Sequence, residues 1–418
     1  MSAFKILALL FLATSAFAQT RELTVDYNAG IAKYKVGSQA LQSYCFDGPS
    51  GVSGLQVDRP QRIASVTKLF TTFFASEKLN LHNKYSLKVH ITPDSLHIEG
   101  GRDPYFEEEK MFLLMKGLND LGYTSFKTIT MDDNFIFSDE ALSQHREITP
   151  AYSRNRLAFF VNKSNRRALL EKWQSVQRFA REEGVDLSNV PMPQITTIGR
   201  VSRVAYPVRD MNETVFVHES LPFHLILKSM NVQSKNIVAH NVFLEAARVQ
   251  NFDEFMISKG FEKKDFAIYN GSGLPMINGN SRLDNLATCR LVLKVISMLD
   301  KSLEQHKLIL SDIVAVSGGK DLGSFRERFK LYPETNQAIL SKTGTLMQTS
   351  ALAGILMMGE KMPFAILNHS TNSSAARSFQ DYFVSRFFHH LGEATPIPYE
   401  KISIFPWNKA DFFSAAIY

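Results

Sequence analysis

A serine and a lysine lie three residues apart within an apolar stretch near the start of the chain. Ser65 and Lys68 belong to the segment RIASVTKLFTTFF, residues 62–74. Residues three apart in a helix share one face, so the lysine amine would lie beside the serine hydroxyl. A serine becomes a good nucleophile when a base takes its proton, and a buried lysine with a lowered pKa is such a base. The pair predicts covalent catalysis.

This spacing also has an ordinary explanation. A serine is a common helix N-cap, and a lysine can extend from an apolar surface to solvent. The same spacing recurs at Ser317 and Lys320, but the two glycines between them make a helix there unfavourable. Ser65 is therefore favoured as the nucleophile only together with two further motifs.

The two further motifs are Ser234-Lys235-Asn236, between two apolar helical segments, and Lys342-Thr343-Gly344, in a strand-like run. With S-x-x-K they match, in the expected order, the set found in serine β-lactamases and penicillin-binding proteins. The S-x-N hydroxyl would relay a proton, and its amide would hold the substrate backbone. The K-T-G strand would supply a cation and a hydroxyl to a substrate carboxylate. Its edge would accept an extended peptide, for which the glycine leaves room.

Two other stretches also fit the S-x-N pattern. Ser153 precedes a long helix and lacks the helix–loop–helix setting, and Ser370 follows Lys342, so its order is wrong. We therefore predict Ser234 as the serine of this motif.

The chain resembles the class C low-molecular-mass penicillin-binding proteins, the DacB-type D-alanyl-D-alanine carboxypeptidase/endopeptidases of peptidase family S13. Besides the three motifs, the stretches that carry the resemblance are IEGGRDPYF, MDDNFIF, MNVQSKNIVAHNVF, NGSGLPMINGNSRLDNLAT, SGGKDLGSFRERF and SKTGTLMQTSALAG. The chain departs from the family in three ways. Lys235 replaces a common aspartate, PMINGN is inserted, and the stretch between Ser65 and Ser234 is shorter than in many members.

The resemblance implies a fold of the α/β (α+β) class. A transpeptidase or β-lactamase-like domain, with an antiparallel sheet flanked by helices, would be interrupted by a reduced inserted domain. The catalytic domain would comprise residues 19–78 and 206–418, and the inserted domain residues 79–205. Alternating and helical apolar patterns along the chain agree with mixed strands and helices. Three apolar runs near the C-terminus, at 338–346, 350–358 and 363–369, predict successive strands.

The resemblance also implies the activity and the catalytic residues. Ser65 would attack the D-Ala-D-Ala carbonyl with Lys68 as base, and water would release the acyl-enzyme. The same site would cleave a D-Ala to diaminopimelate cross-link. The backbone N–H groups of Ser65 and Thr345 would form the oxyanion hole. The residues expected to be catalytic are Ser65, Lys68, Ser234, Asn236, Lys342 and Thr343.

Substrate binding is expected from four residues. Gly344 and Thr345 extend the K-T-G strand. Arg282 matches the arginine of the family's G-S-G-L-S-R stretch and would bind a carboxylate on the diamino acid. Asp132, in MDDNFIF, would pair with the ammonium group of the same stem peptide. The alternative is that Arg282 only supports the following helix and Asp132 only ends a strand.

The expected partners are peptidoglycan stem peptides and cross-links, with β-lactams as covalent inhibitors. A serine β-lactamase and an inactive peptidoglycan-binding homologue remain alternatives, although no E-x-x-L-N stretch separates the first two motifs. A triad hydrolase is disfavoured because no G-x-S-x-G elbow occurs. We expect no cofactor and no metal, since neither CxxC nor HExxH occurs. Nucleic acid is not expected as a partner either.

The N-terminus resembles a cleavable export signal. Lys5, a short apolar run and Ala16-Phe17-Ala18 predict cleavage after Ala18, so residues 1–18 would be a signal peptide. No later apolar run has the length of a membrane span, and we expect no transmembrane anchor. The protein is therefore expected in the periplasm or otherwise exported. Cys45 and Cys289 could form a disulfide there, but two buried thiols fit the sequence equally well.

Overall fold

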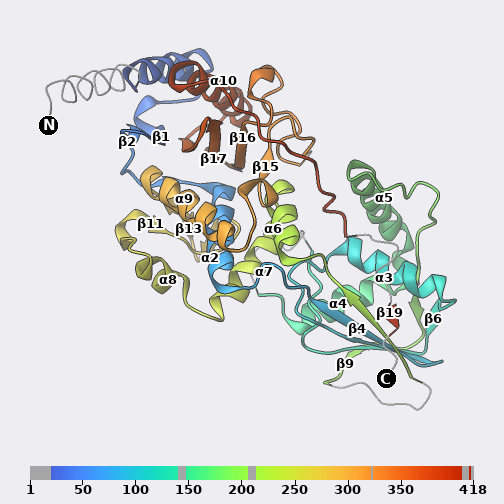
Figure 1. Cartoon of the computed structure of the whole chain (residues 1–418). Helices are drawn as coiled ribbons and strands as arrows, with labels where there is room; N and C mark the ends of the chain where they lie inside the picture. Colours follow the sequence, from blue (N-terminus) through green and yellow to red (C-terminus); the bar gives the residue numbers. More distant parts are fainter. Residues whose placement is uncertain (1–19, 140–146, 206–212, 322, 407–413, 416–418) are drawn as a thin grey trace, which may run out of the picture. The chain divides into compact units, whose positions relative to one another are not determined.

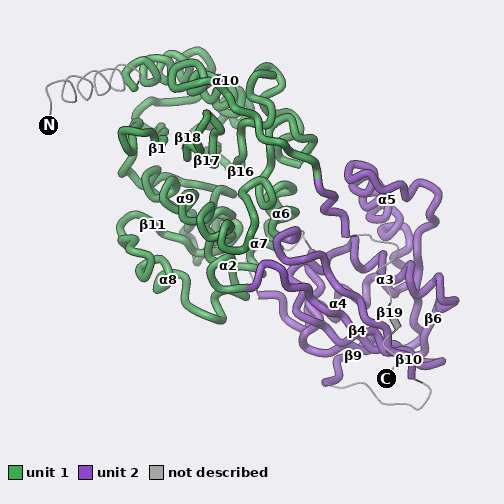
Figure 2. Tube along the Cα trace, in the orientation of Figure 1, with its two compact units in different colours: residues 1–79, 227–401 green, residues 80–226, 402–418 purple. Residues whose placement is uncertain are grey.

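The computed structural model describes residues 20–139, 147–205, 213–321, 323–406 and 414–415. The chain divides into two compact units, which Figure 2 colours separately. The first contains residues 1–79 and 227–401, and the second contains residues 80–226 and 402–418. Compared with the predicted domains, residues 206–226 and 402–418 group with the second unit. The predicted signal peptide lies outside the described residues.

The first unit is built on a six-stranded antiparallel sheet in the order β15-β16-β17-β18-β1-β2. Its strands are β1 Ser43–Gly48, β2 Gly51–Leu55, β15 Ala315–Val316, β16 Ile339–Leu346, β17 Thr349–Met358 and β18 Glu360–Asn368. The three strands predicted near the C-terminus are thereby confirmed, and so is the antiparallel sheet. The central strands are buried on both faces, which explains their nearly continuous apolar sequence.

Helices cover both faces of this sheet. Figure 1 shows α9 on one side and α10 on the other, and α2 packs against α9 and α7. The helices of this unit are residues 20–33, α2 Thr67–Lys78, α6 Phe223–Val232, α7 Asn236–Ala247, α8 Phe252–Ser258, α9 Cys289–Gln305 and α10 Ser373–Leu391. The first four residues of α6, 223–226, belong to the second unit, because the boundary falls at Leu227. The predicted mixed fold of helices and strands is confirmed.

Two details of the first unit differ from the sequence pattern. The apolar pattern of residues 284–299 predicts a helix that begins at Asp284. Helix α9 instead begins at Cys289, because Leu286–Ala287 form strand β14, which pairs with β3 Gln61–Arg62 and β11 Phe266–Ala267. Thr288 then caps the helix through a bond from the Leu291 N–H to its hydroxyl (3.2 Å). The inserted PMINGN stretch forms most of a hairpin, β12 Met276–Asn278 and β13 Ser281–Leu283, whose turn has Gly279 at φ 58°.

Cys45 and Cys289 form a disulfide, which was left open by the sequence. Their Cα atoms are 6.0 Å apart, and the bond joins β1 to the first residue of α9. The bond closes a loop of 244 residues, and long loops lose the most chain entropy when they are closed. Disulfides persist in oxidising compartments, which agrees with the expectation of an exported protein.

The second unit contains a six-stranded mixed sheet in the order β19-β10-β4-β5-β7-β9. Its strands are β4 Ser86–Ile91, β5 Ser95–Glu99, β7 Thr128–Met131, β9 Val201–Arg203, β10 Thr214–Glu219 and β19 Ser414–Ala415, with a separate pair of β6 Ser125–Phe126 and β8 Thr196–Thr197. The strands β5, β7 and β9 run parallel, and the others antiparallel. The core includes residues of α3 Glu108–Asp120, α4 Pro150–Phe160 and α5 Arg166–Glu182.

The described start of the C-terminal tail packs onto the second unit. The ring of Phe405 is buried and lies 5.2 Å from that of Phe179, and the Ile404 N–H donates to Glu183 (3.1 Å). Within the described residues, none of the helices combines the length and the hydrophobicity that crossing a bilayer requires.

Candidate active site

The predicted nucleophile lies in a short turn that leads into α2. Ser65 is the middle residue of the 3-10 turn Ala64–Val66, and α2 begins at Thr67. The Lys68 Nζ donates to the Ser65 Oγ at 3.1 Å, so the structure brings the two groups together as their spacing predicts. Ser65 is half-buried, whereas Lys68 is completely buried.

A neighbouring loop, residues 270–274, holds this turn in place. Ala64 adopts a left-handed φ of 46°, and a Cβ at Gly273 would lie 1.9 Å from the Ala64 carbonyl oxygen. Only glycine fits there, because Gly273 itself has a φ of 85°. Thr71 also donates to the Gly271 carbonyl at 2.7 Å. The loop thus fixes the backbone that carries the nucleophile.

Three acceptors surround the Lys68 amine. Besides Ser65, they are the Asn236 Oδ1 at 2.8 Å and the Ser272 carbonyl oxygen at 2.9 Å. An ammonium has three N–H donors, so these three acceptors can satisfy the buried amine. The sequence predicted Asn236 in the site. The Ser272 carbonyl was missed, because a backbone oxygen leaves no mark in a motif.

A second serine–lysine pair faces the first. Ser234 lies between α6 and α7 at a left-handed φ of 58°, and its Oγ accepts from the Lys342 Nζ at 3.0 Å. Lys342 also donates to the Thr343 carbonyl at 2.9 Å. Burial, together with the nearby charge of Lys68, holds the pKa of Lys342 well below its usual range. The two serine–lysine pairs thus lie near enough for the charge of Lys68 to act on Lys342, and Asn236 is bonded to Lys68.

We expect pH to act differently on the stability of the wild type and of a Lys342→Met variant. Burial lowers the pKa of Lys342 in the folded state, while the unfolded amine keeps a pKa near 10.5. Between these values the unfolded wild type binds the additional proton, so wild-type stability rises with pH. The Lys342→Met variant has no amine at this position, so its stability lacks this rise with pH. Its free energy of unfolding, measured by urea denaturation at a series of pH values, should therefore fall relative to wild type as the pH rises toward 10.5.

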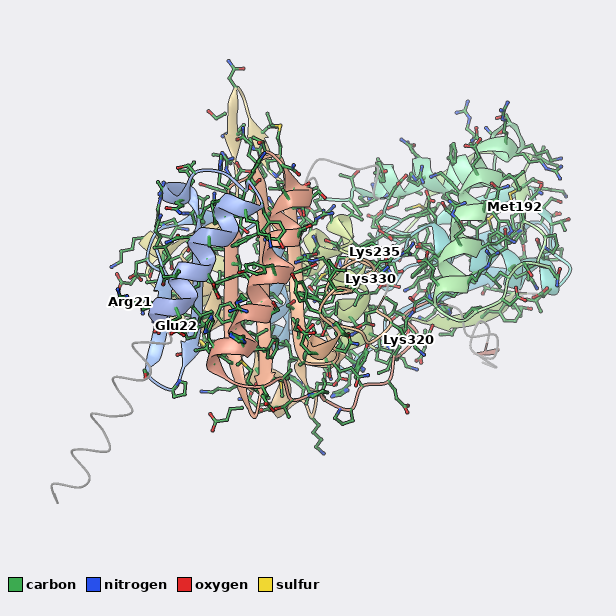
Figure 3. The ribbon with its side chains drawn as sticks, turned by 90° about the horizontal axis from the view of Figure 1, so that it is seen from above. Arg21, Glu22, Met192, Lys235, Lys320 and Lys330 are labelled. Atoms are coloured by element: carbon green, nitrogen blue, oxygen red, sulfur yellow. A yellow bond between two sulfur atoms is a disulfide. The ribbon has the colours of Figure 1, made fainter. Side chains whose placement is uncertain are left out.

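The matched control is Lys330→Met. Lys330, labelled in Figure 3, is exposed and lies 2.7 Å from Glu327. Its removal should change stability by a similar amount at each pH. If both variants respond to pH alike, the burial of Lys342 does not control its protonation.

Gly344 lets strand β16 lie against the nucleophile turn. A Cβ at this position would lie 2.7 Å from the Ile63 carbonyl oxygen and 3.0 Å from the Ser65 nitrogen. The space that glycine leaves is therefore occupied by the turn itself. Thr345, next in the strand, accepts a hydrogen bond at its Oγ1 from Arg377 of α10 (3.1 Å). The sequence analysis did not identify Arg377, which lies outside all three motifs.

Arg282 lies on β13 and is paired within the chain. Its guanidinium donates to both carboxylate oxygens of Asp284 at 2.8–3.1 Å. Arg62 contacts the same carboxylate at 3.0 Å. Two guanidinium groups share one carboxylate, so one positive charge remains uncompensated by Asp284. The substrate-binding role of Arg282 stays a prediction.

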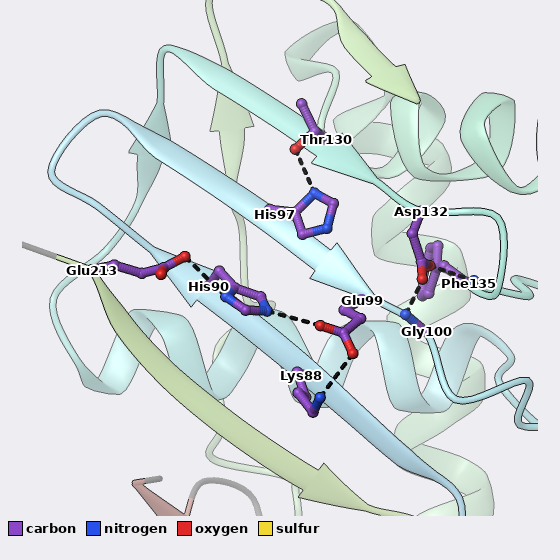
Figure 4. A network of polar contacts seen from close by, with 9 residues as sticks. All are labelled: Lys88, His90, His97, Glu99, Gly100, Thr130, Asp132, Phe135 and Glu213. Carbon is purple, nitrogen blue, oxygen red and sulfur yellow. Dashed lines mark hydrogen bonds and ion pairs between the residues drawn. The ribbon is translucent and has the colours of Figure 1, made fainter. Parts of the chain in front are cut away.

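Asp132 belongs to the second unit. Its Oδ1 accepts from the backbone N–H groups of Gly100 at 2.9 Å and Phe135 at 3.0 Å, which Figure 4 shows. It also accepts from the Asn134 N–H at 3.1 Å. Burial raises the pKa of the Asp132 carboxyl, although these three bonds act in the opposite direction. Asp132 thus ties strand β5 to the segment that follows β7. Its role toward a substrate ammonium also stays a prediction.

The rival serines have structural contacts of their own. Ser153 accepts from the Phe137 N–H at 3.0 Å, and Ser370 forms a turn with Asn372. Ser317 donates to the Thr335 carbonyl at 2.6 Å, and Gly318 after it has a left-handed φ of 63°. Of the candidate serines, Ser65 and Ser234 are therefore the two that contact a buried lysine.

Lys235 is the N-cap residue of α7 and is labelled in Figure 3.

In the described part of the chain, no group of three or more histidine, cysteine, aspartate or glutamate side chains is arranged to hold a metal ion. The hydroxyl and amine groups of the site are of the kinds that can take part in proton transfer and nucleophilic attack.

Structural comparisons find similar solved proteins. The peptidoglycan endopeptidase Bd3459 of Bdellovibrio bacteriovorus is 25% identical with a TM-score of 0.76, over 90% of this chain and 99% of that protein. Bd3459 has also been solved acylated by penicillin G, with 25% identity and a TM-score of 0.71 over the same shares. Penicillin-binding protein 4 (dacB) of Haemophilus influenzae is 15% identical with a TM-score of 0.54, over 83% of this chain and 96% of that protein.

Comparisons of the sequence give two results. No curated protein matches the sequence. A family model, D-Ala-D-Ala carboxypeptidase 3 (S13), matches residues 170–387, which is just over half of the 418 residues. The match includes Ser234, Asn236 and the Lys342-Thr343-Gly344 strand, and the structure supplies Ser65 and Lys68 beside them. The chain therefore belongs to the D-Ala-D-Ala carboxypeptidase 3 (S13) family of peptidases.

Proposed function

We propose that the protein is a serine D,D-peptidase that acts on peptidoglycan stem peptides through an acyl-enzyme on Ser65. It would act as a D-Ala-D-Ala carboxypeptidase, a D-Ala-diaminopimelate endopeptidase, or both. The observation that carries the proposal is the buried cluster in which Lys68 contacts Ser65 and Asn236 while Lys342 contacts Ser234. The activity printed for Bd3459, a peptidoglycan endopeptidase, supports the substrate class.

Acylation begins with proton transfer from Ser65 to Lys68. Lys68 must first be neutral. Two ammonium groups in one buried site repel each other, so the two lysines would share a single proton, and Lys68 is the base when that proton lies on Lys342. The Ser65 Oγ then attacks the carbonyl carbon of the penultimate D-alanine. The backbone N–H groups of Ser65 and Thr345 would stabilise the oxyanion, a contribution of about 3–4 kcal/mol per donor in other enzymes.

The leaving amine then needs a proton. Ser234 is suited to deliver it, because its hydroxyl accepts from Lys342 and can pass on its own proton. The scissile C–N bond breaks, the amine departs, and the acyl group stays on Ser65. The proton that Lys68 took from Ser65 would pass to Lys342, which has given up its own through Ser234, so Lys68 is neutral again. Water then attacks the ester carbonyl with Lys68 as the base, and return of this proton to the Ser65 Oγ releases the acid. Asn236 would hold the substrate backbone beside Lys68, as the resemblance implies.

Three further proposals concern the substrate. Thr343 would contact the substrate carboxylate. Arg282, with the charge that Asp284 leaves uncompensated, would bind a carboxylate on the diamino acid. Asp132 would pair with the ammonium of the same stem.

An exported, periplasmic location fits this substrate. The Cys45–Cys289 disulfide supports it, because such bonds persist in oxidising compartments. The N-terminal sequence supports it as well, through the pattern that predicts cleavage after Ala18.

A β-lactamase and an inactive wall-binding protein are the alternatives. Digestion of purified cross-linked muropeptides, with the products identified by mass spectrometry, separates all three. A D,D-peptidase should release D-alanine, or should convert cross-linked dimers into monomers. Turnover of penicillin without peptide cleavage would indicate a β-lactamase, and binding without any cleavage would indicate an inactive homologue.

A further inference from the structure

The edge of strand β16 is open beside the nucleophile. Strand β15 pairs with β16 only at Leu340 and Ser341, and no described strand follows the edge from 342 to 346. Side chains alternate between the faces of a strand. Position 344 faces the nucleophile turn, so Thr343 and Thr345 face the other side, where α10 lies.

A cavity of about 420 Å³ lies on that other side. It is lined by Thr343, by Ser374, Arg377, Ser378 and Asp381 of α10, and by residues of the segment 323–328. We call it the α10 pocket. Its volume lies within the roughly 300–1,000 Å³ that is typical of small-molecule sites.

The acidic groups of the α10 pocket already have cationic partners. Asp381 accepts from the Arg328 guanidinium at 2.6 Å and from the Phe329 N–H at 3.1 Å. Glu327 pairs with Lys330 at 2.7 Å. Because each of these two carboxylates already has a cationic partner, neither is fully available to neutralise Arg377. Arg377 therefore adds positive charge to the pocket.

Arg377 is held at the edge of the active site. Its guanidinium donates to the Thr345 Oγ1 at 3.1 Å, and the side chain is exposed. A guanidinium has five N–H donors, so this single bond leaves others for a ligand. The first turns of the 19-residue helix α10 also line the pocket, and the N-terminal end of a helix favours negative charge.

We propose that Arg377 and the α10 pocket bind the carboxylate of the residue that leaves from the scissile bond. This inference rests on the proposed function, in which Thr343 contacts the substrate carboxylate and Ser234, bonded to Lys342, delivers a proton to the leaving amine. Arg377 is then a specificity-determining residue, and Thr345 positions its guanidinium. The size of the pocket allows a leaving residue larger than alanine, such as the diamino acid of a cross-link.

The test compares substrates that differ only in this carboxylate. Synthetic stem peptides ending in D-Ala-D-Ala, as the free acid and as the C-terminal amide, are assayed with wild type, Arg377→Ala and Arg377→Lys. In Arg377→Ala, kcat/KM for the acid should fall by about 10- to 100-fold, as expected for a lost charge-assisted bond. The amide should be affected little. Arg377→Lys should restore part of the preference for the acid.

Acylation by benzylpenicillin and by its methyl ester gives the same comparison without peptide turnover. The control is Arg386→Ala, which removes another arginine of α10, one that pairs with Asp26 at 2.6 Å. It should leave the preference for the free acid unchanged.

Three outcomes would overturn the proposal. An equal loss toward acid and amide would mean that Arg377 supports the fold only, and unchanged rates for both would mean that it does not contact the substrate. If wild type neither cleaves the peptides nor forms an acyl-enzyme, the proposed function itself fails, and this inference fails with it.

Discussion

Ser65→Ala should abolish covalent labelling of the folded protein by a fluorescent penicillin. A β-lactam ring opens onto the nucleophile, and the variant keeps the backbone but lacks the Oγ that accepts from Lys68. Labelling is read on a denaturing gel, and mass mapping of the wild type should place the adduct on the peptide that contains Ser65. Circular dichroism verifies that the variant is folded.

The control is the serine of the other S-x-x-K copy. Ser317→Ala removes a buried hydroxyl that bonds to the Thr335 carbonyl, so it should lower stability. It should still be labelled. Stable labelling of Ser65→Ala would contradict both the assignment of the nucleophile and the proposed function.

Lys68→Met should fold, but its acylation should be slower than that of wild type by about 10²–10⁴-fold, the usual contribution of general acid–base catalysis. Methionine fills the space of the lysine stem but cannot take the proton of Ser65. The observed rate constant for acylation is measured by stopped-flow fluorescence at a series of penicillin concentrations. The reduction should appear in the limiting rate, because Lys68 acts on the chemical step rather than on binding.

Lys78→Met is the matched control, since Lys78 lies in the last turn of the same helix and its amine lies 5.3 Å from the Phe255 ring centroid. It should acylate at close to the wild-type rate. A Lys68→Met rate within a few fold of wild type would assign the base to another group, and Lys342 would be the first candidate.

The residues in the site differ in how far the sequence can predict them. Ser65 and Lys68 are local in sequence, so a spacing of three residues in a helical pattern was enough to pair them. Ser234, Asn236 and Lys342 were found through the motif set, although only the fold brings them together. The Ser272 carbonyl and Arg377 reach the site through tertiary packing, and no local pattern records such contacts.

The strands and helices also differ in how far the sequence can predict them. Strands β16 to β18 are long and apolar, so their pattern was clear, whereas β1 and β2 contain glycine and polar residues and gave no such signal. The helical pattern predicts a start of α9 several residues before Cys289, because it includes the apolar residues of the two-residue strand β14. The partner of a cysteine depends on a distance of 6.0 Å between residues 244 positions apart, which no sequence pattern encodes.

The pairing of β1 with β18 sets an order for the biogenesis of the enzyme. Ser43 lies opposite Leu367, so the strand nearest the N-terminus enters the sheet only when nearly the whole chain is available. Residues 80–226, in contrast, form one continuous stretch of the second unit. A nascent chain thus carries Ser65 long before Lys342 has been synthesised. The contacts that place Lys342 and Ser234 beside the Ser65–Lys68 pair therefore cannot form before residue 342 has been synthesised, late in the synthesis of the chain.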